Sequence, residues 1–204
     1  MNEKSLYKLS CGLYIISSSY EDKISGCVAN TLQQVTSSPV QLSITLNKEN
    51  YTEQLIEKSG KFNAVVISQN IDMDVIRRFG FQSGKDIDKY EGIAHRQQIP
   101  YVSEHACAYY TCKVVSHLDV GSHVIFVGEV VDMEVLSEEE VMTYAYYHQV
   151  KNGTTPKKAS SYQEQTEKHG WRCSICGYLY EGEVLPQDYI CPICGAPAAV
   201  FEKI

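Results

Sequence analysis

The chain has 204 residues, of which 44% are hydrophobic and 21% are charged, a composition typical of globular proteins. Its formal net charge of -7 argues against nucleic acid or an anionic membrane surface as a main partner. No stretch approaches the roughly 18 apolar residues of a membrane-spanning helix, and the first residues lack the apolar run of a secretion signal. The sequence therefore predicts a cytoplasmic protein with one ordinary domain and a small one.

Residues 1 to about 136 alternate between β-rich runs and turns. Period-two alternation and enrichment in Val, Ile and Tyr predict strands at 11–17, 24–31, 40–46, 62–68, 106–117 and 123–136. The first two flank a short turn, which is a hairpin signal. Two helices are expected, at 50–60 and at 72–79, the second ended by Gly80. Many strands with few helices favour a closed β-barrel.

The start of the first helix has its own chemistry. Asn50 precedes Glu53 by three residues, a capping-box pattern, and Gly60 follows the last helical residue. The unpaired N–H groups at such a helix start attract anions, and Lys48 lies just before them. The pattern predicts an anion site, although a lysine beside a helix is also commonly a solvated charge.

The eight cysteines form two groups. Four are scattered singly, and four form two Cys-x-x-Cys-Gly knuckles near the end of the chain: Cys173, Cys176, Cys191 and Cys194. Without an export signal, this spacing predicts one tetrahedral site of four thiolates in a reducing compartment. About 35 residues cannot fold on an apolar core alone, so the ion must supply much of the folding free energy. The spacing by itself leaves zinc and iron open.

The residues around the knuckles narrow that choice. Residues 171–182 and 185–196 closely resemble rubredoxins, which carry one iron on four cysteines and transfer single electrons. Aromatic residues fall where rubredoxins place their core: Tyr178, Tyr180, Tyr189 and Phe201. The loop between the knuckles is shorter than in free-standing rubredoxins and nearer the domain that ends rubrerythrins, and Tyr189 stands where Trp is usual. The resemblance implies a redox-active iron.

The larger part of the chain resembles the flavin reductase family, which binds FMN in a split barrel. The resemblance rests on blocks in the family's order, at 26–39, 46–52, 78–86, 121–130 and 144–148. Where most relatives have Gly-Asp-His, this chain has Gly121-Ser122-His123. The implied fold is mainly β: an FMN-binding split β-barrel over residues 1–162, a linker at 163–170 and a rubredoxin-like iron-binding domain at 171–204.

The resemblance also implies which residues contact the cofactor. The FMN phosphate would lie against Asn47, Lys48, Asn50 and Thr52. The isoalloxazine ring would be edged by Ala29, Asn30, Thr31, Ser43, Ile44 and Thr45. His123 and His148 are the catalytic candidates, for the nicotinamide side or the dimer interface. Hydride passes directly from NAD(P)H to the flavin in this family, so no acid–base residue is obligatory.

Together the two resemblances predict an oxidoreductase, usually a homodimer, in which NAD(P)H reduces FMN and FMN passes electrons singly to the C-terminal iron. If residues 163–169 are flexible, seven residues give a reach of about 15 Å. Two-domain proteins of this make-up, the high-molecular-weight rubredoxins, imply a flavodiiron protein that reduces NO or O2 as acceptor. Two alternatives stay open: a free-flavin or ferric reductase with a structural zinc ribbon, and a non-enzymatic flavin-binding electron carrier. The sequence does not choose between NADH and NADPH.

Overall fold

The computed structural model describes residues 3–93, 99–151, 153–156, 159–162 and 170–204. Its larger part is one antiparallel sheet of seven strands in the order β2-β1-β5-β6-β7-β4-β3, and a second sheet has the order β10-β8-β9. The strands of the large sheet are β1 (Tyr14–Tyr20), β2 (Lys23–Ala29), β3 (Gln33–Ser37), β4 (Val40–Asn47), β5 (Lys61–Ile67), β6 (Ala106–Asp119) and β7 (His123–Val135). The small sheet contains β8 (Trp171–Cys173), β9 (Leu179–Tyr180) and β10 (Phe201–Lys203). The predicted mainly β fold class is confirmed.

The large sheet curls into a split barrel. Its longest pair, β6 and β7, shifts register twice, between Thr111 and Cys112 and between Val114 and Ser116. Such irregularities bend and twist the strands that carry them. Within the described residues no ladder joins the end strands β2 and β3, so the barrel is split rather than closed. The predicted first hairpin forms, with β1 paired to β2 throughout.

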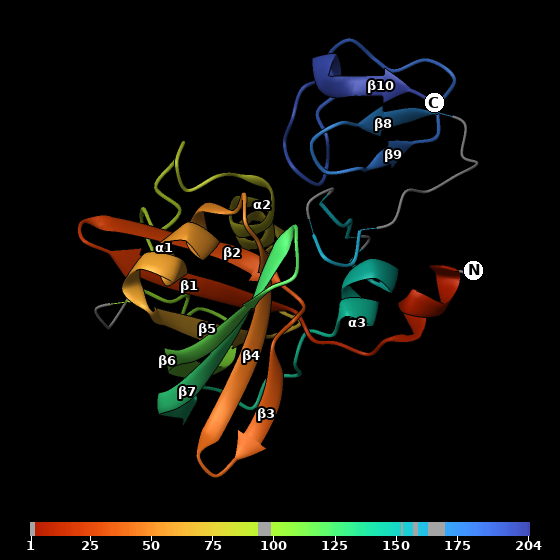
Figure 1. The fold of residues 1–204 in the computed structure, drawn as a ribbon. Helices are drawn as coiled ribbons and strands as arrows, with labels where there is room; N and C mark the ends of the chain where they lie inside the picture. Colours follow the sequence, from red (N-terminus) through yellow and green to blue (C-terminus); the bar gives the residue numbers. More distant parts are fainter. Residues whose placement is uncertain (1–2, 94–98, 152, 157–158, 163–169) are drawn as a thin grey trace.

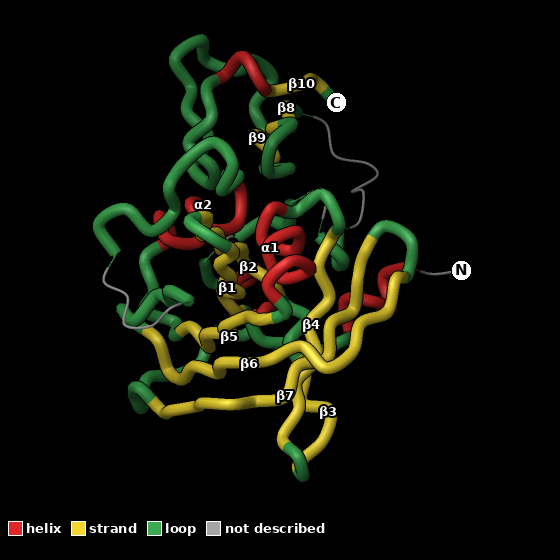
Figure 2. Tube along the Cα trace, turned by 60° about the vertical axis from the view of Figure 1, so that its left-hand side comes forward, coloured by secondary structure: helices red, strands yellow, loops and turns green. Residues whose placement is uncertain are grey.

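Successive side chains of a strand point to opposite faces of the sheet, and on β1 both faces are buried. Ile15 of β1 packs in one hydrophobic cluster, together with Phe79 of α2 (Met73–Phe81). Its neighbour Ile16 packs in a second cluster inside the barrel, together with Phe126 and with Ile56 of α1 (Tyr51–Ser59). These two cores hold α1 and α2 against the sheet. Figures 1 and 2 show where the two helices lie relative to the strands.

The two predicted helices form, with one difference in length. The Asn50 side chain caps α1 by accepting a hydrogen bond from the Thr52 N–H at 2.9 Å, and Gly60 ends it in the left-handed conformation. Helix α2 was expected to end before Gly80, but it continues through Gly80 to Phe81. Gly80 faces Val28 of β2, so packing against the sheet outweighs the low helix propensity of glycine.

Two elements had no clear sequence signal. Strand β3 is exposed along its whole length, so it shows no alternation between apolar and polar residues. Helix α3 (Tyr144–Gln149) has only six residues and is rich in tyrosine, which favours strands. Its first turn is capped by the Thr143 side chain, which accepts from the Tyr146 N–H at 3.1 Å.

The small sheet belongs to a separate lobe that lies above α2 in the views of Figures 1 and 2. This lobe has its own hydrophobic cluster, built from Cys173, Cys176, Cys191, Ile193, Ala196 and Phe201. Phe81, at the end of α2, packs against the same cluster and so links the two lobes. The linker expected at 163–170 lies, except for Gly170, outside the described residues. No described helix is long and apolar enough to cross a membrane.

Candidate flavin cavity and metal centre

A cavity of about 480 Å³ opens between the barrel and the small lobe. Its size suits a ligand as large as a nucleotide cofactor. Of the residues expected to bind the cofactor or act in catalysis, seven line it: Ala29, Asn30, Thr31, Thr45, Asn47, Asn50 and His123. Ser43, Ile44, Lys48, Thr52 and His148 are described but do not appear in the lining.

The start of α1, where the sequence predicts an anion site, borders this cavity. Asn50 and Tyr51, at the start of α1, line the cavity together with Ser83 and Gly84. A methyl group on Gly84 would lie 3.3 Å from the Tyr51 ring, so the loop after α2 reaches the start of α1. The first turn of α1, whose N–H groups have no backbone partner within the helix, therefore meets a polar loop, which is a favourable place for a phosphate.

Lys48 takes no part in this wall. Its ammonium group pairs with the Asp119 carboxylate at the exposed surface. Thr52 is fully buried, and its hydroxyl hydrogen-bonds with that of Ser25 at 3.0 Å. Phosphate contacts from these two side chains stay a prediction.

The buried cation of the cavity is Lys89. Its ammonium group donates to the Gly26 carbonyl at 2.8 Å and to the Phe79 carbonyl at 3.1 Å, and the residue lines the cavity. Burial lowers the pKa of Lys89 to about 8, against a smaller opposing effect of the neighbouring Cys27 thiol. Sequence reasoning missed this residue because its two carbonyl partners come from segments 63 and 10 residues away.

The opposite wall is built by β2 and β4. The Thr31 hydroxyl donates to the Thr45 carbonyl at 2.8 Å and accepts from the Thr45 N–H at 3.1 Å, which ties the end of β2 to β4. Ile44 points into the barrel core, where it is fully buried. On β4 the alternating pattern therefore turns Thr45, rather than Ile44, toward the cavity.

Two polar atoms on the cavity wall have no partner within the described residues. They are His123 Nε2 and Thr154 Oγ1, and both are buried. The other ring nitrogen of His123 lies 2.8 Å from the Ser122 hydroxyl. Buried polar atoms of this kind are almost always paired in folded proteins. A flavin ring with carbonyl oxygens and ring nitrogens could pair both atoms, so the cavity fits FMN.

A third part of the wall, which the sequence did not indicate, is formed by residues 154–156 and 159–161. Ser161 accepts from the Asn30 amide at 3.1 Å and hydrogen-bonds with the Tyr144 hydroxyl at 2.9 Å. His148 lies behind this wall, where its Nδ1 donates to the Gly153 carbonyl at 2.8 Å. Burial lowers the pKa of His148, which favours the neutral ring. This arrangement indicates that His148 supports the wall, and its catalytic role stays a prediction.

The four cysteines of the small lobe converge on one point. Their sulfur atoms all lie within 4.8 Å of one another, with Cys173 and Cys194 at 3.6 Å and Cys176 and Cys191 at 3.5 Å. Sulfurs around a tetrahedral ion with bonds of about 2.3 Å are about 3.8 Å apart, whereas a disulfide measures about 2.0 Å. The four thiols therefore fit one metal ion, and no other such group occurs among the described residues.

Both knuckles use the same turn. The Gly177 N–H donates to the Cys173 carbonyl and the Gly195 N–H to the Cys191 carbonyl, each at 2.9 Å. Both glycines have a positive φ, of 80° and 72°, which a side chain would strain. Around the site, the ring of Tyr189 packs 4.8 Å from that of Tyr180 and 5.5 Å from that of Phe201.

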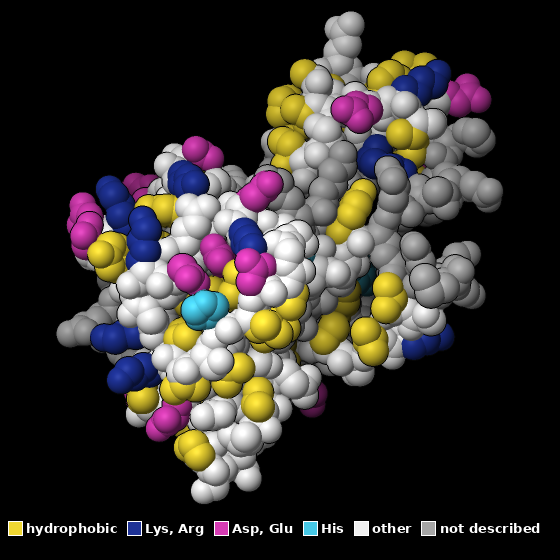
Figure 3. Space-filling view, viewed as in Figure 1, with side chains coloured by type: hydrophobic (Ala, Val, Ile, Leu, Met, Phe, Trp, Pro, Cys, Tyr) yellow, Lys and Arg dark blue, Asp and Glu magenta, His cyan; other side chains and the backbone are white. Residues whose placement is uncertain are grey.

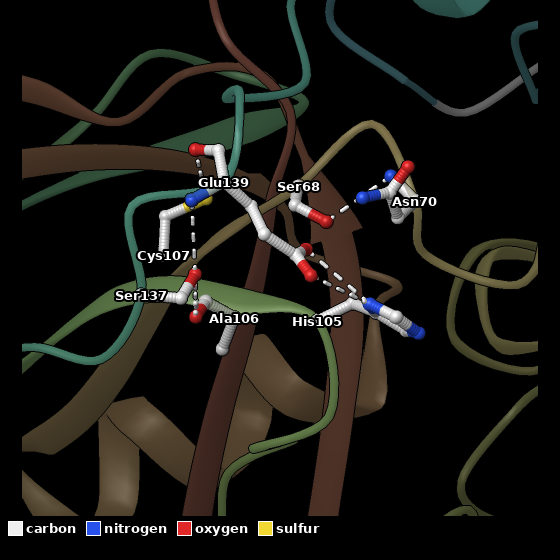
Figure 4. Close-up of polar contacts among 7 residues, drawn as sticks. All are labelled: Ser68, Asn70, His105, Ala106, Cys107, Ser137 and Glu139. Atoms are coloured by element: carbon white, nitrogen blue, oxygen red, sulfur yellow. Dashed lines mark hydrogen bonds and ion pairs between the residues drawn. The ribbon is translucent and has the colours of Figure 1, made fainter.

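One polar cluster far along the sheet could be mistaken for a catalytic site. Figure 4 shows Glu139 beside His105, with the carboxylate 3.3 Å from the imidazole Nδ1. A hydrogen bond from Ser68, and then the contact with His105, lower the pKa of Glu139. Ser68 and His105 therefore both bind the Glu139 carboxylate, whereas in a catalytic triad the histidine lies between the serine and the carboxylate. The cluster fastens the loop after β7 to the ends of β5 and β6.

Comparison with known proteins agrees with both domains. The family described as "Flavin reductase like domain" matches residues 6–155, and "Rubrerythrin, rubredoxin-like domain" matches residues 171–202. The chain is 38% identical, over the full length of both proteins, to a high molecular weight rubredoxin of Moorella thermoacetica. It is 43% identical to a ferric-chelate reductase (NAD(P)H) of Archaeoglobus fulgidus, covering 80% of this chain and 99% of that protein.

The fold is shared with a solved FMN-binding protein of Thermus thermophilus. The TM-score is 0.58 at 20% sequence identity, over 64% of this chain and 73% of that one. FMN for the barrel, iron for the four cysteines and NAD(P)H as substrate are what these two domain families use, as the sequence predicted. The chain belongs to the flavin reductase-like family and carries a rubredoxin-like domain at its C-terminal end.

Proposed function

We propose that this protein is an NAD(P)H-dependent flavin oxidoreductase that delivers electrons through its own rubredoxin-like centre to a separate acceptor protein. One observation carries the proposal: the cavity that fits FMN is lined by the barrel and also by Ser174 and Ile175 of the first metal knuckle. Bound FMN accepts a hydride and releases its electrons singly, whereas one iron ion takes a single electron. Each NAD(P)H would therefore reduce two ferric ions and release one proton.

The residues of the chain position the cofactor rather than supply acid–base groups. The start of α1 and the loop at Ser83 and Gly84 would hold the phosphate, and Lys89 would supply positive charge inside the cavity. His123 and Thr154 would pair with polar atoms of the flavin ring. Four thiolates in a tetrahedral set would hold the iron.

The test is an anaerobic stopped-flow experiment with the full chain. NADH or NADPH should bleach the flavin absorbance first and the iron–thiolate bands after it, at a rate independent of protein concentration. Iron that is reduced only by added free flavin would refute transfer within the protein. Transfer that depends on protein concentration would place it between molecules.

Two other functions make different predictions. A free-flavin or ferric reductase with a structural zinc ribbon would give a protein without the red colour of iron thiolate and with zinc on metal analysis. A flavin-binding electron carrier would keep its flavin oxidised in the presence of either nicotinamide. The relation to a high molecular weight rubredoxin supports the electron-transfer proposal over both. A flavodiiron protein that reduces NO or O2 is the acceptor we propose.

We also propose that the barrel forms a homodimer with a second copy of the chain. Val131, Met133 and Val135 of β7 are 60%, 55% and 69% exposed, and their spacing places them on one face of the strand. Leu118 of β6 is equally exposed, at 59%. Figure 3 shows apolar side chains gathered over the lower part of the barrel, whereas charges of both signs gather near α1. An apolar face of this kind favours association.

A further inference from the structure

The first metal knuckle is part of the wall of the flavin cavity. Ser174 and Ile175, which stand between the two cysteines of this knuckle, line the cavity together with Thr154 and Thr155. A methyl group placed on Gly177 would lie 3.7 Å from the Thr155 carbonyl oxygen. The knuckle therefore lies within contact distance of the part of the cavity wall formed by residues 154–156.

The second knuckle provides an internal comparison, because the two have the same local turn. A methyl group placed on Gly195 would meet nothing within 4 Å, unlike one on Gly177. The corresponding cysteines differ in the same way, since Cys176 is fully buried and Cys194 is partly exposed. The two turns share the same local structure, so the difference at the glycines comes from the contact between the first knuckle and Thr155.

Two residues of α2 anchor the iron-binding lobe from the barrel side. The guanidinium group of Arg77 donates to the carbonyl of Pro192, which lies between the two cysteines of the second knuckle, and also pairs with Asp74 on its own helix. Phe81 packs against the hydrophobic cluster around the four cysteines. Phe81 also lines the cavity, and Cys194 stays partly exposed in spite of these contacts.

From these observations we infer that the first knuckle is the electron-accepting face of the iron-binding lobe, docked on the flavin cavity of its own chain. The docked knuckle brings Cys176 toward the flavin, and the partly exposed edge at Cys194 stays open to a separate acceptor protein. One electron at a time passes from the reduced flavin to the ferric ion across this contact. The inference rests on the proposed function for its redox role, but the docking contact can be tested without electron transfer.

The first experiment uses the full chain loaded with zinc and FMN. Because zinc is not redox-active, no electron reaches the metal site in this protein. Hydrogen exchange of single amides, followed by NMR, compares Gly177 with Gly195, whose N–H groups make matched hydrogen bonds. We expect Gly177 to exchange more slowly, on the order of tenfold or more, because Gly177 lies against Thr155 whereas a methyl group on Gly195 would meet nothing within 4 Å. Equal exchange rates at the two glycines would overturn the docking.

The second experiment perturbs the contact. Ile175→Asp places a charge on the cavity wall, and Ile190→Asp is the matched control, since Ile190 is 57% exposed beside the second knuckle and does not line the cavity. In Ile175→Asp we expect Gly177 to exchange as fast as Gly195 and the FMN dissociation constant to rise on the order of tenfold. The control should leave both quantities unchanged.

A second pair of variants changes residues of α2, so that the result does not depend on whether an altered iron-binding lobe still folds. Arg77→Ala removes the contact with Pro192, whereas Arg78→Ala, its control, removes a bond to the Glu91 carbonyl within the barrel. In iron-loaded protein, Arg77→Ala should slow flavin-to-iron transfer and leave flavin reduction by NAD(P)H unchanged, because Arg77 does not line the cavity. If NAD(P)H does not reduce the flavin in any variant, the proposed function fails, and the exchange and FMN results still decide the docking. Unchanged amide exchange at Gly177 and unchanged FMN affinity in both Ile175→Asp and Arg77→Ala would overturn the docking.

Discussion

Replacing Lys89 with Met should weaken FMN binding and remove most of its pH dependence between pH 8 and 10. Lys89 is the buried cation of the cavity wall, and burial lowers its pKa to about 8 from 10.5. This shift corresponds to a cost of about 3 kcal/mol for the charged form in the empty protein at neutral pH. An anionic cofactor in the same cavity stabilises the charged form and raises the pKa again.

The sign of the effect follows from that linkage. In the protein without FMN, Lys89 loses its proton as the pH passes about 8. The charged ammonium group therefore destabilises the fold fully below pH 8, and this cost is relieved as the pH rises from about 8 to 10.5. FMN binding then requires proton uptake, so its dissociation constant should rise with pH above about 8. If the bound anion restores the ordinary pKa, the total loss of affinity is at most about 300-fold.

The assay is a fluorescence titration of the flavin-free full chain with FMN at pH 7, 8, 9 and 10. At pH 7 we expect Lys89→Met to bind FMN about 10- to 100-fold more weakly, the loss of a hydrogen bond from a charged group. Lys113→Met is the control: Lys113 of β6 is exposed and does not line the cavity, so it should change the constant by less than about threefold. The same pH dependence in wild type and Lys89→Met would refute the reasoning.

Three further predictions concern the metal, the dimer and the cavity wall. Removing the metal with a chelator, or substituting Cys173→Ser, should unfold the C-terminal lobe and leave the barrel intact, as followed by hydrogen exchange; a lobe that keeps its protection without metal would contradict the site. Val131→Glu combined with Met133→Glu should halve the mass measured by light scattering, and an unchanged dimer would exclude this face of β7 as the interface. Gly26→Ala should lower stability by about 1–3 kcal/mol, because its methyl group would lie 2.6 Å from the Tyr90 hydroxyl, whereas Gly80→Ala meets Val28 only at 3.6 Å. Equal melting temperatures for these two variants would contradict the packing described for β2.

Local patterns in the sequence determined the metal site and the start of α1. The two Cys-x-x-Cys-Gly knuckles contain their own turns, so four residues in two short segments specify the whole coordination sphere. The Asn50 cap and the Gly60 end are likewise properties of one short segment. The alternating strands predicted the sheet, because a half-buried strand leaves a period-two signature in its own residues.

Tertiary structure decided what depends on distant segments. Lys89 becomes the cavity cation because the carbonyls of Gly26 and Phe79 hold it, and Lys48 is drawn to Asp119, 71 residues away. The seating of Ile175 beside the flavin cavity depends on contacts between two separately folded lobes. No short stretch of sequence records such a contact, because its free energy comes from surfaces that meet only after each lobe has folded.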